Sequence, residues 1–509
     1  MTLFNKKCSN KREITMANWF KKEYKKPRLT EEVYQTFRKS EDFICQFNSH
    51  AIRPFWFCYQ RNIIDTKTLN EQILPYLLYT KIYSIRELKG IIPNKEIVIT
   101  NKAKEIKEKL LQGCIMIQFH KHDSYCALID AVKFEKRSIS VPEVEFSVNG
   151  PKEAFVESID TNLNLIRRRL PVPELRVKEL VVGKLTRTKV AVLYIEDIVE
   201  KENVQTILQR INDIEFDQIN DTSFISEIIV DNQESIFPQV LETERPDRVA
   251  SVLVEGKVVV LSEGSPQAII APTTLVEFFS SFEDYFLNWY IASFVRMLRF
   301  FSVVFSILIT PIYVAVLTYH HELIPRDLLA TLVISRREVP LPPILEALFL
   351  ELVIELLREA GARLPAKVGQ TIGIVGGIVI GTASVEAGIT SNVLLIMIAL
   401  AALASFTTPI YSMGNTIRII RFPFLIFAQL WGLLGIVLCF CFLLTHLIQL
   451  TSLGRPFLEP IYPLRIGDLK DAFIRLPFSK LVKRPLLVRA EDETRFKPKK
   501  ARTKKDIDE

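Results

Sequence analysis

The sequence has few of the residues from which a disulfide framework or a zinc site is built. Its 509 residues include seven cysteines, an odd number, and none of them forms a Cys-x-x-Cys pair. Cys439 and Cys441 lie within an apolar run. This pattern argues against a disulfide framework and a zinc site, and it favours a reducing compartment for the soluble part of the chain.

Signatures of catalysis are also missing. The first 285 residues contain no glycine loop of the kind that cradles phosphate, no Ser-His-Asp arrangement and no metal-ligand cluster. His120, His122 and Asp123 lie together in a turn, but no further ligand signature accompanies them, and we interpret them as a solvated hairpin tip. We therefore expect no enzymatic activity, no catalytic residue, no cofactor and no metal.

The chain does not begin with an apolar segment of the kind found in signal peptides. Its first 28 residues, MTLFNKKCSNKREITMANWFKKEYKKPR, are basic and lack an apolar core, so we expect the soluble part to stay in the cytoplasm. The net charge of +7 is carried mostly by the two ends. Next to a membrane region, basic ends favour an anionic lipid surface over nucleic acid.

The length and the distribution of charge predict several domains. Charged and apolar residues alternate before about residue 285, whereas charges become scarce from Phe300 to Gly454. We predict an α+β, multipass membrane protein in which two cytoplasmic α/β subdomains precede an α-helical transmembrane bundle. The predicted parts are a basic N-terminal lead-in (1–44), a first soluble subdomain (45–145), a second soluble subdomain (146–285), a transmembrane helical domain (286–454) and a basic cytoplasmic tail (455–509).

The soluble half has the patterns of strands and helices. GCIMIQF and YCALIDAV flank a turn and predict a hairpin. VNGP places Pro151 at the start of a helix that we expect to end at Pro171. RVASVLVEG, KVVVLSEG and QAIIAP predict a β-meander. The basic cluster Arg167–Arg169 could bind an anion, although such clusters more often form a solvated face or ion pairs between domains.

Four membrane spans are predicted. Residues 300–319 carry no charge in 20 residues. At a rise of ~1.5 Å per residue they would extend ~30 Å, enough to cross the hydrocarbon layer. Pro311 would kink this helix without breaking it. The other spans are predicted at 369–386, 389–410 and 422–448, whereas residues 344–359 are predicted to form an amphipathic or re-entrant helix.

Another region of interest is the glycine-rich run KVGQTIGIVGGIVIGTASVEAGI. Glycines at a spacing of four form a ridge without side chains, against which another helix can pack closely. These glycines are Gly369, Gly373, Gly377 and Gly381. The roughly opposite face carries the predicted pore-lining residues Ile372, Val375, Val379, Thr382 and Glu386. The alternative is a tightly packed transmembrane helix without a pore.

Three glutamates fall on one face of the helix predicted at 344–359, namely Glu351, Glu355 and Glu359. A carboxylate within a membrane usually faces a bundle interior or a water-filled path, which predicts a cation-attracting vestibule formed by Glu351 and Glu355. The alternative is a helix that lies along the membrane surface with its acids in water. The sequence does not decide between these two interpretations.

The topology is constrained by charge. The residues from Lys480 to Lys505 include 11 Lys and Arg against three acids, which favours the cytoplasmic side. With both ends cytoplasmic, the number of crossings must be even, and we adopt four. This model leaves Arg418 and Arg421 on the outer side, contrary to the usual distribution of basic residues.

Several long stretches together resemble one protein family. They are VNGPKEAFVESIDTNLNLIRRRL, TERPDRVA, EALFLELVIELLREAGARLP, VGQTIGIVGGIVIGTASVEAGI and RLPFSKLVKRP. Through them the chain resembles, from roughly Ser40 to Pro485, the A subunit of the GerA-type spore germinant receptor. One departure is GTASVEAG, where Thr382 stands in place of an expected glutamine and alters the polarity of a lining position.

The resemblance implies a multipass protein of the inner membrane of the dormant spore. It implies two partners, a transporter-like B subunit that is thought to hold the nutrient and a lipoprotein C subunit. It also implies self-association into a ring around a channel that releases monovalent cations when nutrient binds. We expect contact with membrane lipid and no nucleic-acid partner.

Two alternatives to a channel-forming subunit stay open. The first is a non-conducting scaffold that transmits the signal and whose soluble domains recruit the other receptor subunits. The second is the related membrane protein of the dipicolinate-transport operon. The ending LTSLGRPFLEPIYPL followed by DLKDAFIRLPF is more similar to the receptor A subunit.

Overall fold

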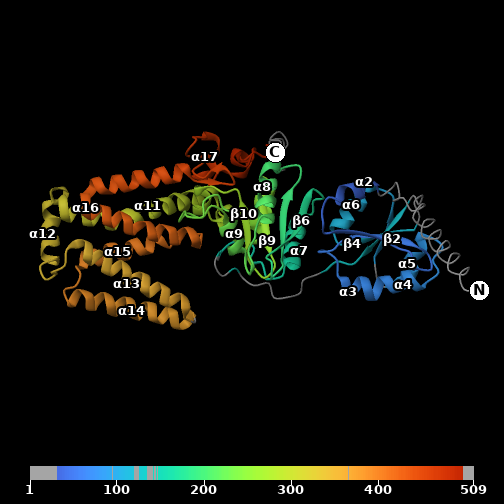
Figure 1. Cartoon of the computed structure of the whole chain (residues 1–509), viewed down its shortest axis with the longest axis horizontal. Coiled ribbons are helices and arrows are strands. Elements are labelled where there is room, and N and C mark those ends of the chain that lie inside the picture. Colours follow the sequence, from blue (N-terminus) through green and yellow to red (C-terminus); the bar gives the residue numbers. More distant parts are fainter. Residues whose placement is uncertain are drawn as a thin grey trace, which may run out of the picture.

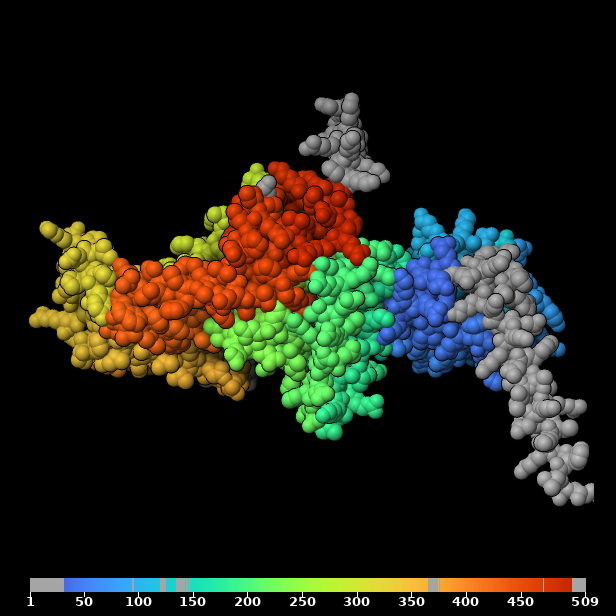
Figure 2. Space-filling model, turned by 45° about the horizontal axis from the view of Figure 1, so that its top comes forward, coloured from blue at the N-terminus to red at the C-terminus, as the bar shows by residue number. Residues whose placement is uncertain are grey.

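The computed structural model describes residues 31–93, 96–119, 125–133, 142, 145, 147–364 and 366–496, without the side chains of 31, 366–373, 375 and 470. His120, His122 and Asp123 lie outside the described residues. Three regions follow one another along the molecule (Figure 1): a first unit (31–133), a second unit (147–285) and a helical region (289–449). A C-terminal segment (451–496) turns back over the second unit, as Figure 2 also shows.

The first unit is built on a five-stranded antiparallel sheet with the order β1-β2-β4-β5-β3. The strands are β1 (Phe43–Asn48), β2 (Phe55–Gln60), β3 (Ile97–Thr100), β4 (Cys114–Gln118) and β5 (Cys126–Asp130). Helices α2 (Glu31–Phe37) and α6 (Ala103–Leu111) cover one face. The other face is covered by α3 (Thr66–Thr68), η2 (Leu69–Ile73), α4 (Leu74–Tyr79), η3 (Ile85–Glu87) and α5 (Leu88–Ile91). The predicted pairing of GCIMIQF with YCALIDAV is confirmed, with Met116 opposite Leu128.

The second unit repeats this plan with another five-stranded antiparallel sheet, in the order β6-β7-β9-β10-β8. Its strands are β6 (Leu175–Val182), β7 (Thr188–Ile195), β8 (Leu241–Thr243), β9 (Val258–Ser262) and β10 (Ala268–Ala271). Helices α7 (Ile159–Arg169) and α10 (Pro246–Glu255) cover one face, and α8 (Lys201–Asn212) and α9 (Thr222–Ile229) cover the other. Alternate residues of β9 therefore enter two different cores: Val259 and Leu261 in one, Val258 and Val260 in the other.

The predicted strand in RVASVLVEG is wrong, because this run forms α10. Pro246 is favourable in the first turn of a helix, where its missing N–H has no acceptor to lose. Gly256 ends the helix with a φ of 100°, a conformation that glycine adopts without strain. Val249 and Leu253 lie one helical turn apart and are buried on the same face. The valines that suggested a strand thus follow a helical period.

The predicted start of α7 at Pro151 is also wrong. The helix begins at Ile159, and residues 151–156 have no regular secondary structure. Phe155 is buried in the core and its backbone N–H donates to the carbonyl of Glu244 at 2.8 Å, so the segment is held by the second unit without being helical. The expected end before Pro171 is confirmed.

Cys45 and Cys58 correct the expectation of free cysteines. They are direct partners in the register of β1 and β2, with their Cα atoms 4.0 Å apart, and they form a disulfide. Cys114, Cys126, Cys439 and Cys441 are free thiols. The sequence did not reveal the pair because the register of β1 and β2 brings the two residues together. Their spacing in the sequence matches no recognisable cysteine motif.

The first two units are joined through a buried ion pair. Arg167 of α7 donates to Asp42, which precedes β1, with an N–O distance of 2.9 Å, and both side chains are almost completely buried. Arg167 also donates to the hydroxyl of Ser40 at 3.1 Å, and that hydroxyl accepts the backbone N–H of Val177 in β6. Of the three interpretations of the basic cluster, an ion pair between domains therefore applies to Arg167.

The helical region contains six helices within its described residues. They are α11 (Trp289–Tyr319), α12 (Arg326–Ser335), α13 (Pro343–Arg363), α14 (Ala366–Glu386), α15 (Asn392–Ser405) and α16 (Tyr411–Gln449). Helices α11 and α16 run side by side, and α14 lies along α13 at the edge of the region (Figure 1). Helix α11 passes through Pro311, whereas α16 has a non-helical residue at Gly432.

Two of these helices, α11 and α16, are long and apolar enough to cross a membrane. They contain the predicted spans 300–319 and 422–448. The predicted span 369–386 lies within α14. The predicted span 389–410 coincides with a helix of only 14 residues, α15, which is shorter than the ~20 residues that a crossing needs. Helix α13 extends beyond 344–359 at both ends.

The Arg167–Asp42 pair predicts a stability effect. Arg167→Met leaves the Asp42 carboxylate buried without a cation, so we expect the free energy of unfolding to fall by about 3–5 kcal/mol. The measurement is denaturant unfolding of the full chain in detergent.

The matched control is Arg168→Met, which changes the exposed neighbouring residue and should alter stability by about 0.5 kcal/mol or less. Equal effects of the two substitutions would contradict a stabilising role for the buried pair.

Candidate functional site in the helical region

The centre of the helical region is a buried ion pair between α13 and α16. Glu351 and Arg421 lie 2.5 Å apart, and each side chain is only 2% exposed. Arg421 also donates to the hydroxyl of Ser306 at 3.0 Å, and Glu351 accepts from the hydroxyl of Thr310 at 3.2 Å. Three helices are therefore joined at one polar point.

The sequence of α11 explains why this point forms where it does. Ser306 and Thr310 are four residues apart, so they share one face of an otherwise apolar helix, and both are buried. Glu351 and Arg421 would each be very costly to bury alone among apolar helices, whereas together they neutralise each other and their hydrogen bonds are shared with the two hydroxyls. The charged groups thus specify which faces of the helices meet.

A second carboxylate of α13 lies between two guanidinium groups. Glu355 is 3.3 Å from Arg358 on its own helix and 3.6 Å from Arg418 of α16. Arg358 lies over the ring of Phe406, 4.5 Å from its centre. The charges of Glu351 and Glu355 are therefore met by three arginines of the same chain.

A third carboxylate fixes the beginning of α13. Glu346 is fully buried, lies 2.7 Å from Arg336 at the end of α12, and accepts the backbone N–H of Ser391 at 3.2 Å. Ser391 caps α15, because its hydroxyl accepts the N–H of Leu394. This glutamate thus connects three helices, and sequence reasoning missed it because it singled out residues one turn further along.

These contacts bear on the predicted acidic vestibule. The structure brings Glu351 and Glu355 together, but each faces an arginine inside the chain, whereas Glu359 is exposed and pairs with Arg363. Sequence reasoning named Arg421 only for its conflict with the usual distribution of basic residues and missed its pairing with Glu351. The structure places Arg421 within α16, where it meets that carboxylate.

Helix α14 carries the predicted pore-lining face on its open side. Val379 is 55% exposed, and Thr382 and Glu386 are also exposed. The hydroxyl of Thr382 donates to the carbonyl of Ile378 at 2.8 Å, so its polarity is partly satisfied by its own helix. Ile372 and Val375 belong to the side chains that the structure does not describe.

The glycines of α14 lie at different distances from their neighbours. A Cβ atom at Gly381 would lie 3.7 Å from Leu395 of α15, whereas one at Gly377 would meet no atom within 4 Å. The tightest position is Gly376, where a Cβ atom would lie 2.8 Å from Leu357 of α13. Gly376 is not on the predicted ridge, and Gly369 and Gly373 fall in the part of α14 described by its backbone alone.

Comparison with known proteins identifies the family. The model of the family described as "Bacillus/Clostridium GerA spore germination protein" matches residues 31–487. The chain belongs to this family. It is 50% identical to spore germination protein GerQA of Bacillus cereus, over 93% of this chain and 95% of that protein. It is 38% identical to spore germination protein A1 of Bacillus subtilis, over 83% of this chain and 88% of that protein.

One solved structure is also similar, the N-terminal domain of the A subunit of the Bacillus megaterium spore germinant receptor GerK3. The match covers 47% of this chain and 92% of that domain, with 22% identity and a TM-score of 0.37. The family assignment rests on the sequence matches, which extend through both α/β units and the helical region.

The Glu351–Arg421 pair predicts a large effect of a single substitution. Arg421→Met leaves a carboxylate buried among apolar helices, so we expect a loss of about 3–5 kcal/mol in stability. The double variant Glu351→Gln, Arg421→Met should lose less, because no uncompensated charge remains. The measurement is unfolding of the full chain in detergent.

The control is Arg363→Met, which breaks the exposed pair with Glu359 on the same helix as Glu351 and should cost less than about 1 kcal/mol. A double variant as unstable as Arg421→Met alone would contradict the explanation by a bare buried charge.

Proposed function

We propose that the chain is the A subunit of a nutrient receptor complex in the inner membrane of the spore, where it triggers germination when nutrient is sensed. Membership of the GerA family from residue 31 to residue 487 supports this proposal. So do two helices, α11 and α16, that are long and apolar enough to cross a membrane. The chain spans the membrane several times, and its two soluble units lie in the cytoplasm.

The subunit acts by forming a cation channel with further copies of itself. The observation that carries this proposal is the open face of α14, where Val379 and Thr382 are exposed on a helix at the edge of the helical region (Figure 1). In a ring of copies, this face would line a narrow apolar path. Glu386 at the end of the helix would place negative charge near its mouth and favour cations.

The complex contains two other subunits, a transporter-like B subunit that holds the nutrient and a lipoprotein C subunit. The first and second units of this chain lie in a row outside the helical region, so they offer surfaces for contacts away from the membrane (Figure 1). Because the B subunit binds the nutrient, this chain converts the signal and does not select the nutrient.

A non-conducting scaffold is the second candidate function, and one observation favours it. Glu351 and Glu355 are compensated by arginines within the chain, so they supply little free negative charge to attract cations. In this case the open face of α14 is an assembly surface. The two functions differ in what happens when a side chain on that face is made smaller.

The test is Val379→Ala in dormant spores without nutrient. A smaller side chain widens an apolar constriction and lets water enter, so the channel proposal predicts a several-fold increase in potassium leak and spontaneous germination. Potassium release is measured by flame photometry in purified spores, and the amount of receptor by immunoblotting.

The matched control is Ile374→Ala, an equally exposed residue of α14 that lies on a different side of the helix from Val379. It should leave the leak unchanged. Tight spores with normal receptor levels for Val379→Ala, and also for Val375→Ala and Thr382→Ala, would reject the channel and favour the scaffold.

A further inference from the structure

A cavity of about 140 Å³ lies between the second unit, the linker that leads from its sheet to α11, and the C-terminal segment. One wall is formed by α10, by Lys257 just before β9, and by Leu241 of β8 and Ile270 of β10. The second is the linker from the sheet to α11, which includes η4 (Leu275–Phe279) and η5 (Phe282–Tyr285). The third is the C-terminal segment with α17 (Ile466–Ala472). The chain therefore lines this cavity both just before it enters the helical region and after it leaves.

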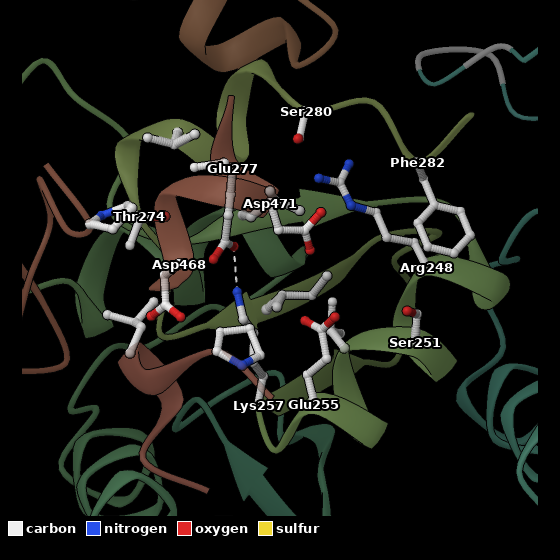
Figure 3. Close-up of a pocket in the computed structure, with 18 of the residues that line it drawn as sticks. Arg248, Ser251, Glu255, Lys257, Thr274, Glu277, Ser280, Phe282, Asp468 and Asp471 are labelled. Carbon is white, nitrogen blue, oxygen red and sulfur yellow. Dashed lines mark hydrogen bonds and ion pairs between the residues drawn. The ribbon is translucent and has the colours of Figure 1, made fainter. Parts of the chain in front are cut away.

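The lining combines apolar surface with charged groups, as small-molecule sites usually do. Val252 and Ile270 come from the second unit, and Phe282 and Tyr285 add aromatic rings from the linker. Five carboxylates and two basic side chains also line the cavity. Figure 3 shows the carboxylates of Asp471 and Glu255 directed into the same space from opposite walls.

Both basic side chains of the lining already have carboxylate partners. The buried Lys257 pairs with Glu277, and Arg248 lies 3.0 Å from Glu145 (Figure 3 shows the first pair). A bound anion would have to displace one of these partners. The cavity is therefore poorly suited to an acidic ligand.

The carboxylates of α17 are less well compensated. Asp468 accepts the backbone N–H of Leu486 at 3.0 Å, and no basic side chain lies within ion-pair distance of it among the described residues. Asp471 accepts from the hydroxyl of Tyr285 at 3.4 Å, and its nearest guanidinium, that of Arg296, is 3.9 Å away. Because the two carboxylates are three residues apart on one helix, they repel each other.

The environment of two carboxylates of the lining, Asp468 and Glu255, disfavours their charge. Burial raises the pKa of Asp468; the N–H of Leu486 and the charge of Arg465 oppose this shift, and the nearby carboxylate of Asp471 adds to it. Burial also raises the pKa of Glu255, to which Asp471 contributes again, although Arg495 opposes the shift. A positive charge placed between these groups would remove this penalty.

We propose that this cavity binds a small organic cation, with its ammonium group near Asp468 and Asp471 and its apolar part against Val252 and Phe282. Aromatic rings also favour such a cation. No group of residues suited to a metal ion is found in the described part of the chain, which favours an organic cation over a metal.

The C-terminal segment that would hold the ligand also contacts α11. Arg296 of α11 donates to the backbone carbonyl of Asp471, and Ser293 donates to the carbonyl of Arg475 at 3.1 Å. The C-terminal segment is attached to the second unit by Arg495, which lies 2.8 Å from Glu255. A cation held by α17 therefore stabilises the attachment of this segment to both α11 and the second unit.

The test is calorimetric titration of the full chain in detergent with n-butylamine, using n-butanol and butyrate as the neutral and anionic counterparts. Of the three compounds, we expect only butylamine to bind. Asp468→Asn keeps an acceptor for the N–H of Leu486 but removes the charge, so it should weaken binding by about tenfold or more.

The matched control is Glu491→Gln, an acid of the C-terminal segment that pairs with Lys201 and is not part of the lining. It should bind butylamine as the unmodified chain does. Hydrogen exchange of the unmodified chain gives a second measurement that does not depend on the folding of a variant, and butylamine should slow exchange in residues 466–488.

Three results would overturn the proposal. They are no binding of butylamine to the unmodified chain, equal binding of butanol, and binding that Asp468→Asn leaves unchanged. Binding of calcium in place of butylamine with the same dependence on Asp468 would also reject an organic cation and assign a metal to the cavity.

Discussion

The helical region depends on the buried pair of Glu351 and Arg421. Apolar helices can slide and rotate against each other at little cost, whereas a buried charge tolerates few partners and few distances. Because Glu351 lies on α13, Arg421 on α16 and the two hydroxyls on α11, only one mutual arrangement satisfies all of them. The remaining helices, including the exposed α14, are placed relative to this fixed group of three.

Buried arginines occur at the other junctions of the molecule as well. Arg167 joins the first unit to the second through Asp42. At the start of α11, Arg296 and Arg299 both lie within 3.4 Å of the buried Asp284. Each guanidinium offers several donors in a fixed plane, so it can connect two or three segments at once. The first two units are thus joined by directional contacts of this kind, whereas the second unit and the helical region also share one continuous apolar core.

The sequence predicted most of the local structure and little of the tertiary contacts. Short apolar runs bounded by turns revealed β4, β5, β9 and β10, and the uncharged run from Phe300 identified α11. The strand predicted within α10 is wrong because valine is compatible with both a strand and a helix. The helix is marked in the sequence by its boundaries, Pro246 at its start and Gly256 at its end. The Cys45–Cys58 disulfide and the Arg421 partner were missed for another reason. Strand register brings Cys45 and Cys58 together, and the partner of Arg421 lies on a helix 70 residues earlier in the chain. Neither pairing leaves a local pattern in the sequence.

The same contacts narrow where a cation path could lie. Glu351 and Glu355 of α13 are compensated by arginines within the chain, so the cation path proposed above cannot depend on them for selectivity. Val379, Thr382 and Glu386 are instead exposed along one side of α14, a helix packed on its other side by Leu357 and Leu395. A movement of α13 relative to α16 would therefore carry this face with it. The Glu351–Arg421 pair, which holds α13 against α16, therefore also constrains where this face of α14 lies.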